Sequence, residues 1–352
     1  MLVVRAIHAS DLDALYGLAS QVGTGMTTLK PDMTMLGDRL AIACASFAET
    51  IAPEKRDYMF VMEDTDNGRL AGVCAIKGSV GLDEPFYNYR IGTLVHSSRE
   101  LDVFTRMETL YLSNDLTGST ELCSLFLHPD YRSGTNGKLL SKSRFLFIAQ
   151  FPHLFTEKLI AEMRGFQAPD GSSPFYEGLG RHFFKMDFHH VDDLTSLGKK
   201  SFIAELMPRQ PMYVAYLPAP AQEVIGKVHL STAPARRLLE QEGMHFEGYV
   251  DIFDAGPVLQ ARVSELRAMR DSALCVLDAE AGAGDVCQPA AAPSEPLLIS
   301  NTVLRDFRMI VSAAAPAGGK LALSEAEQTL LHCRAGDAVR TLPLNLRKNP
   351  HV

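Results

Sequence analysis

A glycine-rich stretch at residues 127–140, LHPDYRSGTNGKLL, combines residue types that can bind a phosphate group. Arg132 precedes Gly134 and Gly137, and Lys138 opens an apolar run that is expected to be helical. Glycine destabilises a helix interior, so two glycines at a helix start need a reason. The first helical turn leaves main-chain N–H groups without partners, and glycines let an anion approach them closely. The stretch therefore predicts a nest for a pyrophosphate, with the arginine and the lysine adding positive charge.

The spacing of these glycines leaves a plainer alternative open. The stretch lacks the GxxxxGK[ST] pattern of a P-loop and the GxGxxG pattern of a dinucleotide-binding fold. An ordinary glycine-rich turn would also account for the same residues.

Two groups of histidines are further candidates for chemistry. His229 lies between two apolar residues in GKVHLSTAPA, beside a Ser–Thr pair. Histidine titrates near neutral pH and can give or take a proton, although a hydrogen-bonded structural role is the alternative. His189 and His190 form a pair without a third ligand at a suitable spacing, so we expect a solvated helix cap there and no metal site.

Composition narrows the class of protein. The net charge of −8 argues against a nucleic-acid-binding protein, which needs a basic face. The six cysteines form no CxxC pair and mostly lie in apolar runs, so they predict neither a disulfide framework, nor a zinc site, nor an activated nucleophile. No stretch reaches the ~18 apolar residues of a membrane span, and residues 1–10 predict a strand instead of a signal peptide. A cytoplasmic protein that binds no membrane is expected.

The elements around the glycine-rich stretch predict a mixed sheet. The stretch lies between an apolar strand and a long helix, which places the glycines in the turn that connects the strand to the helix. Strands are expected at 2–7, 57–63, 69–78, 88–98, 107–115, 121–127 and 158–166, with helices near 12–18, 34–51 and 138–150.

The second half of the chain predicts a similar but weaker pattern. Strands are expected at 212–217 and 248–253, a helix at 256–273, and short strands with one short helix after 297. Residues 279–296 are rich in Ala, Gly and Pro, which predicts a flexible loop or insertion. The segments 159–188 and 213–253 both place a short helix ending near glycine between two strands, so we expect a duplication and two domains, 1–195 and 196–352.

Several of these stretches resemble the GNAT superfamily of acyl-CoA N-acyltransferases. LFLHPDYRSGTNGKLL is similar to its acyl-CoA-binding motif, [QR]xxGx[GA], with Arg132 and Gly137 in register and the middle glycine at 134 instead of 135. SSPFYEGLGRHFF resembles the later motif in which a tyrosine protonates the leaving thiolate. The resemblance implies an α+β fold with a central mixed sheet, and it makes Tyr176 a candidate proton donor.

Residues 1–275, and more loosely the C-terminus, resemble one family in particular, the arginine N-succinyltransferases. The resemblance is carried by VRAIHASDLDAL, LFLHPDYR, EMRGFQAPDGSSPFYEGLGRHFF, GKVHLSTAPARRLLEQEGM and GYVDIFDAGPVL. It implies an acyltransferase that uses succinyl-CoA as co-substrate, without a permanently bound cofactor, to convert L-arginine into N2-succinylarginine in arginine catabolism.

The family resemblance also implies roles for individual residues. His229 matches the residue held to be the proton donor, with Tyr176 as its rival. Leu125 matches a contact to succinyl-CoA, which for a leucine in a strand would be made by main-chain groups. Asp251 and Asp254 are expected to meet the guanidinium of the arginine substrate, because guanidinium groups prefer bidentate carboxylates, with a turn at the strand end as the alternative.

Two other functions fit the sequence. One is a GNAT-type enzyme with a different acyl donor or amine. The other is a non-catalytic CoA-binding subunit, because some members of the family are heteromers of two homologous chains. An oligomer of identical or homologous chains is expected in either case.

Overall fold

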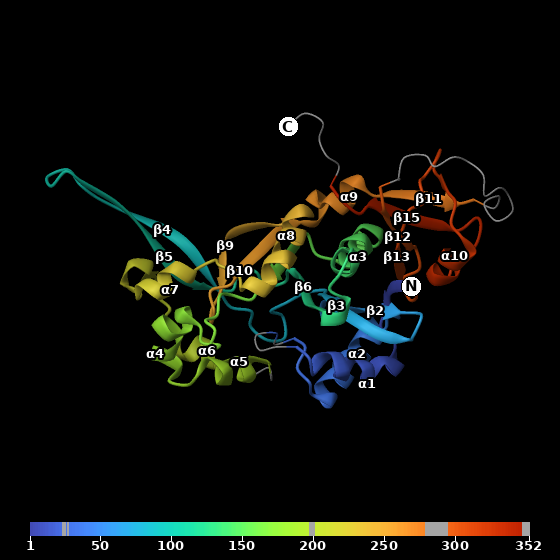
Figure 1. The fold of residues 1–352 in the computed structure, drawn as a ribbon. Helices are drawn as coiled ribbons and strands as arrows, with labels where there is room; N and C mark the ends of the chain where they lie inside the picture. The colour runs from blue at the N-terminus through green and yellow to red at the C-terminus, as the bar shows by residue number, and fades with distance from the viewer. Residues whose placement is uncertain (23–25, 27, 197–200, 279–294, 347–352) are drawn as a thin grey trace.

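The computed structural model describes residues 1–22, 26, 28–196, 201–278 and 295–346 (Figure 1). In its first half the elements are β1 (Leu2–Ala6), α1 (Leu12–Ala19), α2 (Met33–Phe47), β2 (Asp57–Asp64), β3 (Arg69–Lys77), β4 (Asn88–Ser98), β5 (Val103–Ser113), β6 (Thr120–Leu127), α3 (Asn136–Gln150) and β7 (Lys158–Glu162).

The second half contains shorter helices before it returns to strands. Its elements are α4 (Arg181–Phe184), α5 (Phe188–Ser196), α6 (Ser201–Leu206), β8 (Met212–Tyr213), α7 (Ala219–Val224), α8 (Ala233–Gln241), β9 (His245–Asp251), β10 (Pro257–Arg262), α9 (Arg267–Asp271), β11 (Ala273–Leu277), β12 (Leu297–Asn301), β13 (Arg308–Ser312), β14 (Lys320–Leu321), α10 (Glu325–Leu331) and β15 (Ala338–Pro343).

These strands join in one mixed sheet over the described residues. Its order is β14-β11-β15-β12-β13-β1-β2-β3-β6-β7-β10-β9-β4-β5-β8. Most neighbours are antiparallel, whereas β6 and β7 are parallel. The mixed α/β class with a central mixed sheet is therefore confirmed.

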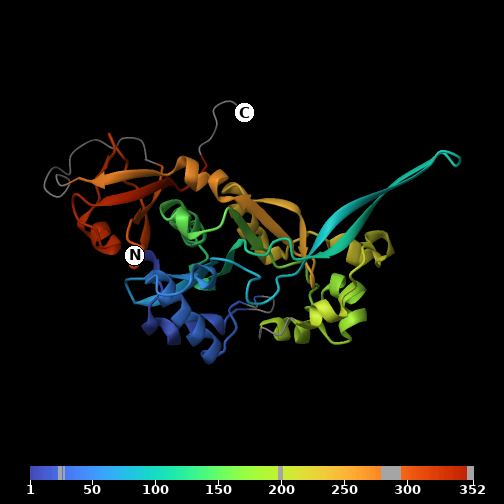
Figure 2. The same ribbon diagram turned by 180° about the vertical axis from the view of Figure 1, so that it is seen from behind.

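Helices cover both faces of the central strands (Figures 1 and 2). On one face α3 packs on the side chains of Tyr58, Phe60 and Cys74, with Phe147 at the centre of an aromatic cluster. On the other face α1 and α2 pack on the alternate residues of the same strands, among them Met59 and Val61. Because successive strand residues point to opposite faces, these two clusters assign each residue of the central strands to one face.

The expected helix at 256–273 is wrong in its first half. Residues 257–262 form β10, which is inserted between β7 and β9. Five of its six residues are buried, so its sequence is nearly continuous in apolar character and lacks the alternation that marks a half-exposed strand. The helix α9 covers only Arg267–Asp271.

The sheet continues across the expected domain boundary between residues 195 and 196. β10 pairs with β7, and β9 pairs with β4, so strands from both expected domains share hydrogen bonds. The division into two domains and the duplication stay predictions. Of the expected loop at 279–296, residues 279–294 lie outside the described residues.

The C-terminal strands extend the sheet, and the chain after β15 is hydrogen-bonded to α3. β13 pairs with β1, so β11 to β15 continue the same sheet. Lys142 on α3 donates to the carbonyl of Leu344 (3.0 Å) and pairs with Glu242 (2.8 Å). The β4–β5 hairpin projects away from this body (Figure 1). Among the described residues, none of the helices combines the length and apolarity needed to cross a membrane.

Candidate active site

A cavity of about 1020 Å³ opens where the parallel strands β6 and β7 part. Thr120 pairs with Leu159 and Glu121 with Ile160, and within the described chain no later pair joins these strands. Both strands continue as walls of the cavity, with residues 121–127 on one side and 161–164 on the other. Beyond these pairs, the facing main-chain groups of the two described strands do not hydrogen-bond to each other. A ligand can therefore lie between the strands and bond to these groups.

The wall formed by β6 carries a β-bulge. Val73 of β3 lies opposite Phe126 and Ala75 lies opposite Cys123, so Ser124 and Leu125 together face the single residue Cys74. Ser124 has a φ of 54°, a left-handed conformation that is uncommon for a residue with a side chain. A bulge interrupts the hydrogen-bond ladder, and bulges are over-represented beside active sites. Leu125 lines the cavity at this bulge, and its expected main-chain contact to the donor stays a prediction.

Arg39 of α2 holds the bulge in place, and sequence reasoning missed it. Its Nη1 donates to the Ser124 hydroxyl (2.7 Å), and its Nε donates to Asp57 (2.7 Å). The Ser124 hydroxyl in turn lies 3.0 Å from that of Thr28, which also lines the cavity. The buried Arg39–Asp57 pair thus ties the bulge to the segment that precedes α2. No motif in the sequence marks this arginine.

The glycine-rich stretch lies at the mouth of the cavity. Arg132, Gly134, Gly137 and Lys138 all line it, as the sequence predicted for a common site. Gly134 has a φ of 56°, whereas Gly137 is helical, and a Cβ atom at either position would meet nothing within 4 Å. Arg132 donates to the carbonyl of Leu127 (2.9 Å), and Lys138 donates to Asn345 (2.7 Å). The space beside the first turn of α3 is open, as an anion nest requires.

His229 lies beside β7, and its neighbours Ser231 and Thr232 line the cavity, although His229 itself is not among the lining residues. Its main-chain N–H donates to the carbonyl of Arg164 (2.9 Å), next to a bridge between Val228 and Gly165. Its Nδ1 accepts the N–H of Ser231 (3.2 Å) and lies 2.7 Å from the Ser231 hydroxyl. Partial burial, and then the charge of Arg164, lower the pKa of His229 below its ordinary value. The ring is therefore neutral near pH 7, with its proton on Nε2.

Tyr176, the rival proton donor, already donates its hydroxyl proton to another group of the protein. Its ring is buried against Phe184 and Phe188, and its hydroxyl donates to the carbonyl of Met186 (2.9 Å). Burial raises its pKa to about 12. Tyr176, like His229, is not among the residues that line the cavity, although its ring neighbour Phe188 lines it.

Asp251 and Asp254 line the cavity, but main-chain groups already hold their oxygens. Asp251 accepts the N–H groups of Phe253 (2.7 Å) and of Asp254 (2.8 Å). Asp254 accepts those of Gly165 (2.7 Å) and Gly256 (2.8 Å). Burial, and then the neighbouring Asp251 carboxylate, raise the pKa of Asp254 well above its usual range. The two carboxyl groups stabilise a turn, and their expected contact to a guanidinium stays a prediction.

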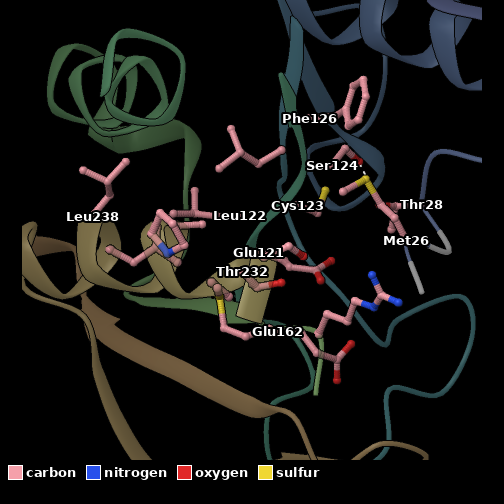
Figure 3. A pocket seen from close by; sticks show the side chains of 18 of the residues that line it. Met26, Thr28, Glu121, Leu122, Cys123, Ser124, Phe126, Glu162, Thr232 and Leu238 are labelled. Carbon is pink, nitrogen blue, oxygen red and sulfur yellow. Dashed lines mark hydrogen bonds between the residues drawn. The ribbon is translucent and has the colours of Figure 1, made fainter. Parts of the chain in front are cut away.

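Two other acidic residues line the cavity where the strands part, and sequence reasoning missed both. They are Glu121 and Glu162 (Figure 3). The Glu121 side chain is only 8% exposed, and its one partner among the described residues is the Lys77 ammonium group at 4.0 Å. Glu162 accepts a hydrogen bond from Asn88 (3.0 Å). In the sequence, each glutamate is a single acidic residue at the edge of an apolar strand. Such a residue is also typical of an exposed strand end, so it does not indicate a site.

Both glutamates belong to the sheet face opposite α3. Leu122 packs with the α3 cluster and Cys123 with the α1–α2 cluster, so the alternation puts Glu121 on the α1–α2 side. In β7, Ala161 packs with the α3 cluster, which puts Glu162 on the other side as well. The cavity is therefore acidic on the face that Thr28 borders, and it is lined by the glycine-rich stretch on the face of α3.

Cysteine and metal chemistry find no support in the site. Burial raises the pKa of Cys74 to about 11 and also raises that of Cys123, so both thiols stay protonated near neutral pH. The described parts of the chain contain no group of three or more potential metal ligands. Cys287 lies outside the described residues.

The chain matches one family along almost its whole length. A family model described as the arginine N-succinyltransferase beta subunit matches residues 2–268, and one described as the C-terminal domain of that subunit matches residues 287–343. Arginine N-succinyltransferase subunit beta of Pseudomonas aeruginosa is 48% identical over 347 residues, which cover 99% of each chain. Arginine N-succinyltransferase of Shigella sonnei is 46% identical over 344 residues, which cover 98% of each.

A solved structure agrees with this match. Subunit AI of the arginine/ornithine succinyltransferase from Pseudomonas aeruginosa superposes with a TM-score of 0.87 at 34% identity, covering 98% of this chain and 99% of that one. The sequence-based prediction of a mixed α/β fold with a central mixed sheet is confirmed.

Proposed function

Because the chain belongs to the arginine N-succinyltransferase family, we propose that it transfers the succinyl group of succinyl-CoA to the α-amine of L-arginine. The products are N2-succinylarginine and CoA. The observation that carries this proposal is the parting of β6 and β7 around a cavity that reaches from the glycine-rich stretch to a pair of glutamates.

The donor fits the side of the cavity next to α3. The first turn of α3, with its glycines and nearby cations, is suited to a pyrophosphate. The pantetheine arm, which carries two amides, fits between two strands with unpaired edges. The bulge at Ser124 and Leu125 then lies where a thioester carbonyl would need main-chain donors.

We propose that His229 transfers the protons of the reaction. The arginine α-ammonium loses a proton and its nitrogen forms a bond to the thioester carbon. The nitrogen then loses a second proton to become an amide, the C–S bond breaks, the CoA thiolate takes up one proton, and the other is released to solvent. A neutral imidazole can accept a proton at Nδ1, through the Ser231 hydroxyl that contacts it, and can release one from Nε2. We therefore assign the proton transfer to His229 in preference to Tyr176.

Glu121 is the carboxylate best placed for the cationic end of the substrate. It is buried, lines the cavity and has a single distant cationic partner in the described chain. A guanidinium can donate two parallel hydrogen bonds to a carboxylate. We propose that Glu121, with Glu162 beside the same opening, receives the guanidinium of arginine.

The proposal predicts a defined product. The purified chain, given L-arginine and an equimolar mixture of acyl-CoAs, should form N-succinylarginine as its main product by mass spectrometry. A different acyl group in the product would indicate another GNAT activity. CoA binding without any product from the chain alone would favour the non-catalytic subunit, and only a homologous partner would then restore activity.

A second prediction concerns the glycine-rich stretch. Replacing Gly137 with valine should weaken CoA binding by about 1–3 kcal/mol, the scale of losing a few charge-assisted hydrogen bonds. The fold should persist, because a Cβ atom there meets nothing within 4 Å and the residue is helical. Titration calorimetry measures the affinity. Gly17→Val is the matched control, since Gly17 lies in α1 with equally open space and should leave CoA affinity unchanged.

A further inference from the structure

Among the described residues, one buried cation lacks the anionic partner that the other buried cations have. Arg5 pairs with Asp11, Arg39 pairs with Asp57, and Lys142 and Arg267 share Glu242. Arg144 on α3 is equally buried, at 2% exposure, yet no carboxylate pairs with it among the described residues. Its Nε and Nη2 donate only to the carbonyl (3.2 Å) and hydroxyl (3.1 Å) of Ser141, one turn earlier.

No nearby group neutralises the Arg144 charge. Burial lowers the pKa of the Arg144 guanidinium, and the ionisable groups that act on this pKa are the thiols of Cys74 and Cys123, which burial keeps protonated. A buried charge without an anionic partner is costly, and guanidinium stays charged in proteins. Such an arrangement persists where a ligand supplies the missing anion.

The position of Arg144 shows which part of a ligand it would meet. Gly137, Leu140 and Arg144 have the i, i+3, i+7 spacing of one helix face, and all three line the cavity. Arg144 lies ~10 Å along α3 from Gly137, at 1.5 Å per residue. The same turn of α3 contacts Cys74, whose thiol lies 3.4 Å from the Leu140 carbonyl and 3.6 Å from the Ser143 hydroxyl.

Cys74 is also the β3 residue that faces the bulge at Ser124 and Leu125. Arg144 therefore lies at the level of the bulge, on the α3 face of the sheet. The acidic pair Glu121 and Glu162 lies on the opposite face, so the two sides of the cavity separate a positive from a negative subsite.

We propose that Arg144 binds the terminal carboxylate of the succinyl group and so selects a dicarboxylic acyl donor. This inference rests on the proposed function. The succinyl carboxylate lies ~4 Å beyond the thioester carbon, across three carbon–carbon bonds of ~1.5 Å. That reach fits a thioester at the bulge and a guanidinium at the same level of α3. Acetyl-CoA and butyryl-CoA lack the charge and leave the arginine unpaired.

Arg144→Met tests this role through donor selectivity. The ratio of kcat/KM for succinyl-CoA to that for butyryl-CoA should fall by about 10²-fold or more, because a buried charge pair is lost for one donor only. Arg144→Lys should retain part of the preference. Arg237→Met is the control: Arg237 is an exposed cation that also lines the cavity, so its loss should affect both donors alike.

Binding without arginine separates this inference from the proposed function. Calorimetry on the full chain should give tighter binding of succinyl-CoA than of butyryl-CoA in the wild type and equal binding in Arg144→Met. The variant without ligand should unfold at the same or a higher temperature than wild type, because an unpaired buried charge has been removed. An unchanged succinyl preference in folded Arg144→Met overturns the inference, whichever amine the enzyme acylates.

Discussion

His229→Ala should lower kcat for arginine succinylation by about 10²–10⁴-fold, the usual contribution of one group that transfers protons. A thioester is already activated, so direct attack by the amine needs no acyl-enzyme, and positioning supplies much of the remaining rate. CoA affinity should stay nearly unchanged, because the glycine-rich stretch is at the mouth of the cavity and contacts no part of the His229 ring in the described structure. Stopped-flow or steady-state assays of CoA release measure kcat, and calorimetry measures the affinity.

The pH dependence provides a second readout of the same residue. Because the pKa of His229 is lowered, the imidazolium loses its extra proton at a pH below 6.5, the ordinary pKa of histidine. The ring is therefore neutral above pH 6.5. Activity that needs the neutral ring should therefore fall on the acid side only below pH 6.5, and this limb should disappear in His229→Ala. An NMR titration that places the His229 pKa above 6.5 would contradict this account.

A matched control is His245, which is exposed at the start of β9 and does not line the cavity. His245→Ala should keep wild-type kcat. If folded His229→Ala also keeps it, the proton role passes to Tyr176, and Tyr176→Phe becomes the deciding variant. The hydrogen bond from Tyr176 to Met186 makes that outcome unexpected.

The sequence predicted the parts of this site that follow from local rules. A strand, a proline, two glycines and a helix in succession specify a strand-to-helix turn with free N–H groups, and Gly134 and Gly137 lie at such a turn. These features depend on neighbours in the chain, so one sequence suffices to predict them. The family resemblance added His229, which the structure places in contact with Ser231, a residue that lines the cavity.

The features that escaped prediction depend on contacts between distant segments. The apolar run at residues 257–262 is equally compatible with a helix. It forms the buried strand β10 because it lies between β7 and β9 in the sheet. Arg39 acts through Ser124, 85 residues away, and nothing local marks either residue. For Asp251 and Asp254 the sequence left a strand-end turn and a substrate contact open, because it does not display the main-chain N–H groups whose hydrogen bonds these carboxyl groups accept.

Glu121→Gln should lower kcat/KM for arginine by about 10²-fold, because a buried carboxylate that pairs with a guanidinium loses its charge. A thioester carbon near Leu125 lies about 13 Å from Glu121 along the strand, at ~3.3 Å per residue. An extended arginine side chain carries its guanidinium about 6 Å away from the reacting end, over five bonds of ~1.5 Å. The guanidinium end of the acceptor is therefore the part that reaches Glu121.

The kinetic pattern distinguishes this role from a catalytic base. Loss of a binding contact should raise KM for arginine with a small change in kcat, whereas loss of a base would lower kcat at saturating arginine. Citrulline has the shape of arginine without its charge, so wild type should prefer arginine strongly and Glu121→Gln should prefer it much less. Glu247→Gln, at an exposed β9 position outside the cavity, should keep the wild-type preference. Equal turnover of arginine and citrulline by the wild type would exclude a carboxylate contact to the guanidinium, because only the charge separates the two substrates.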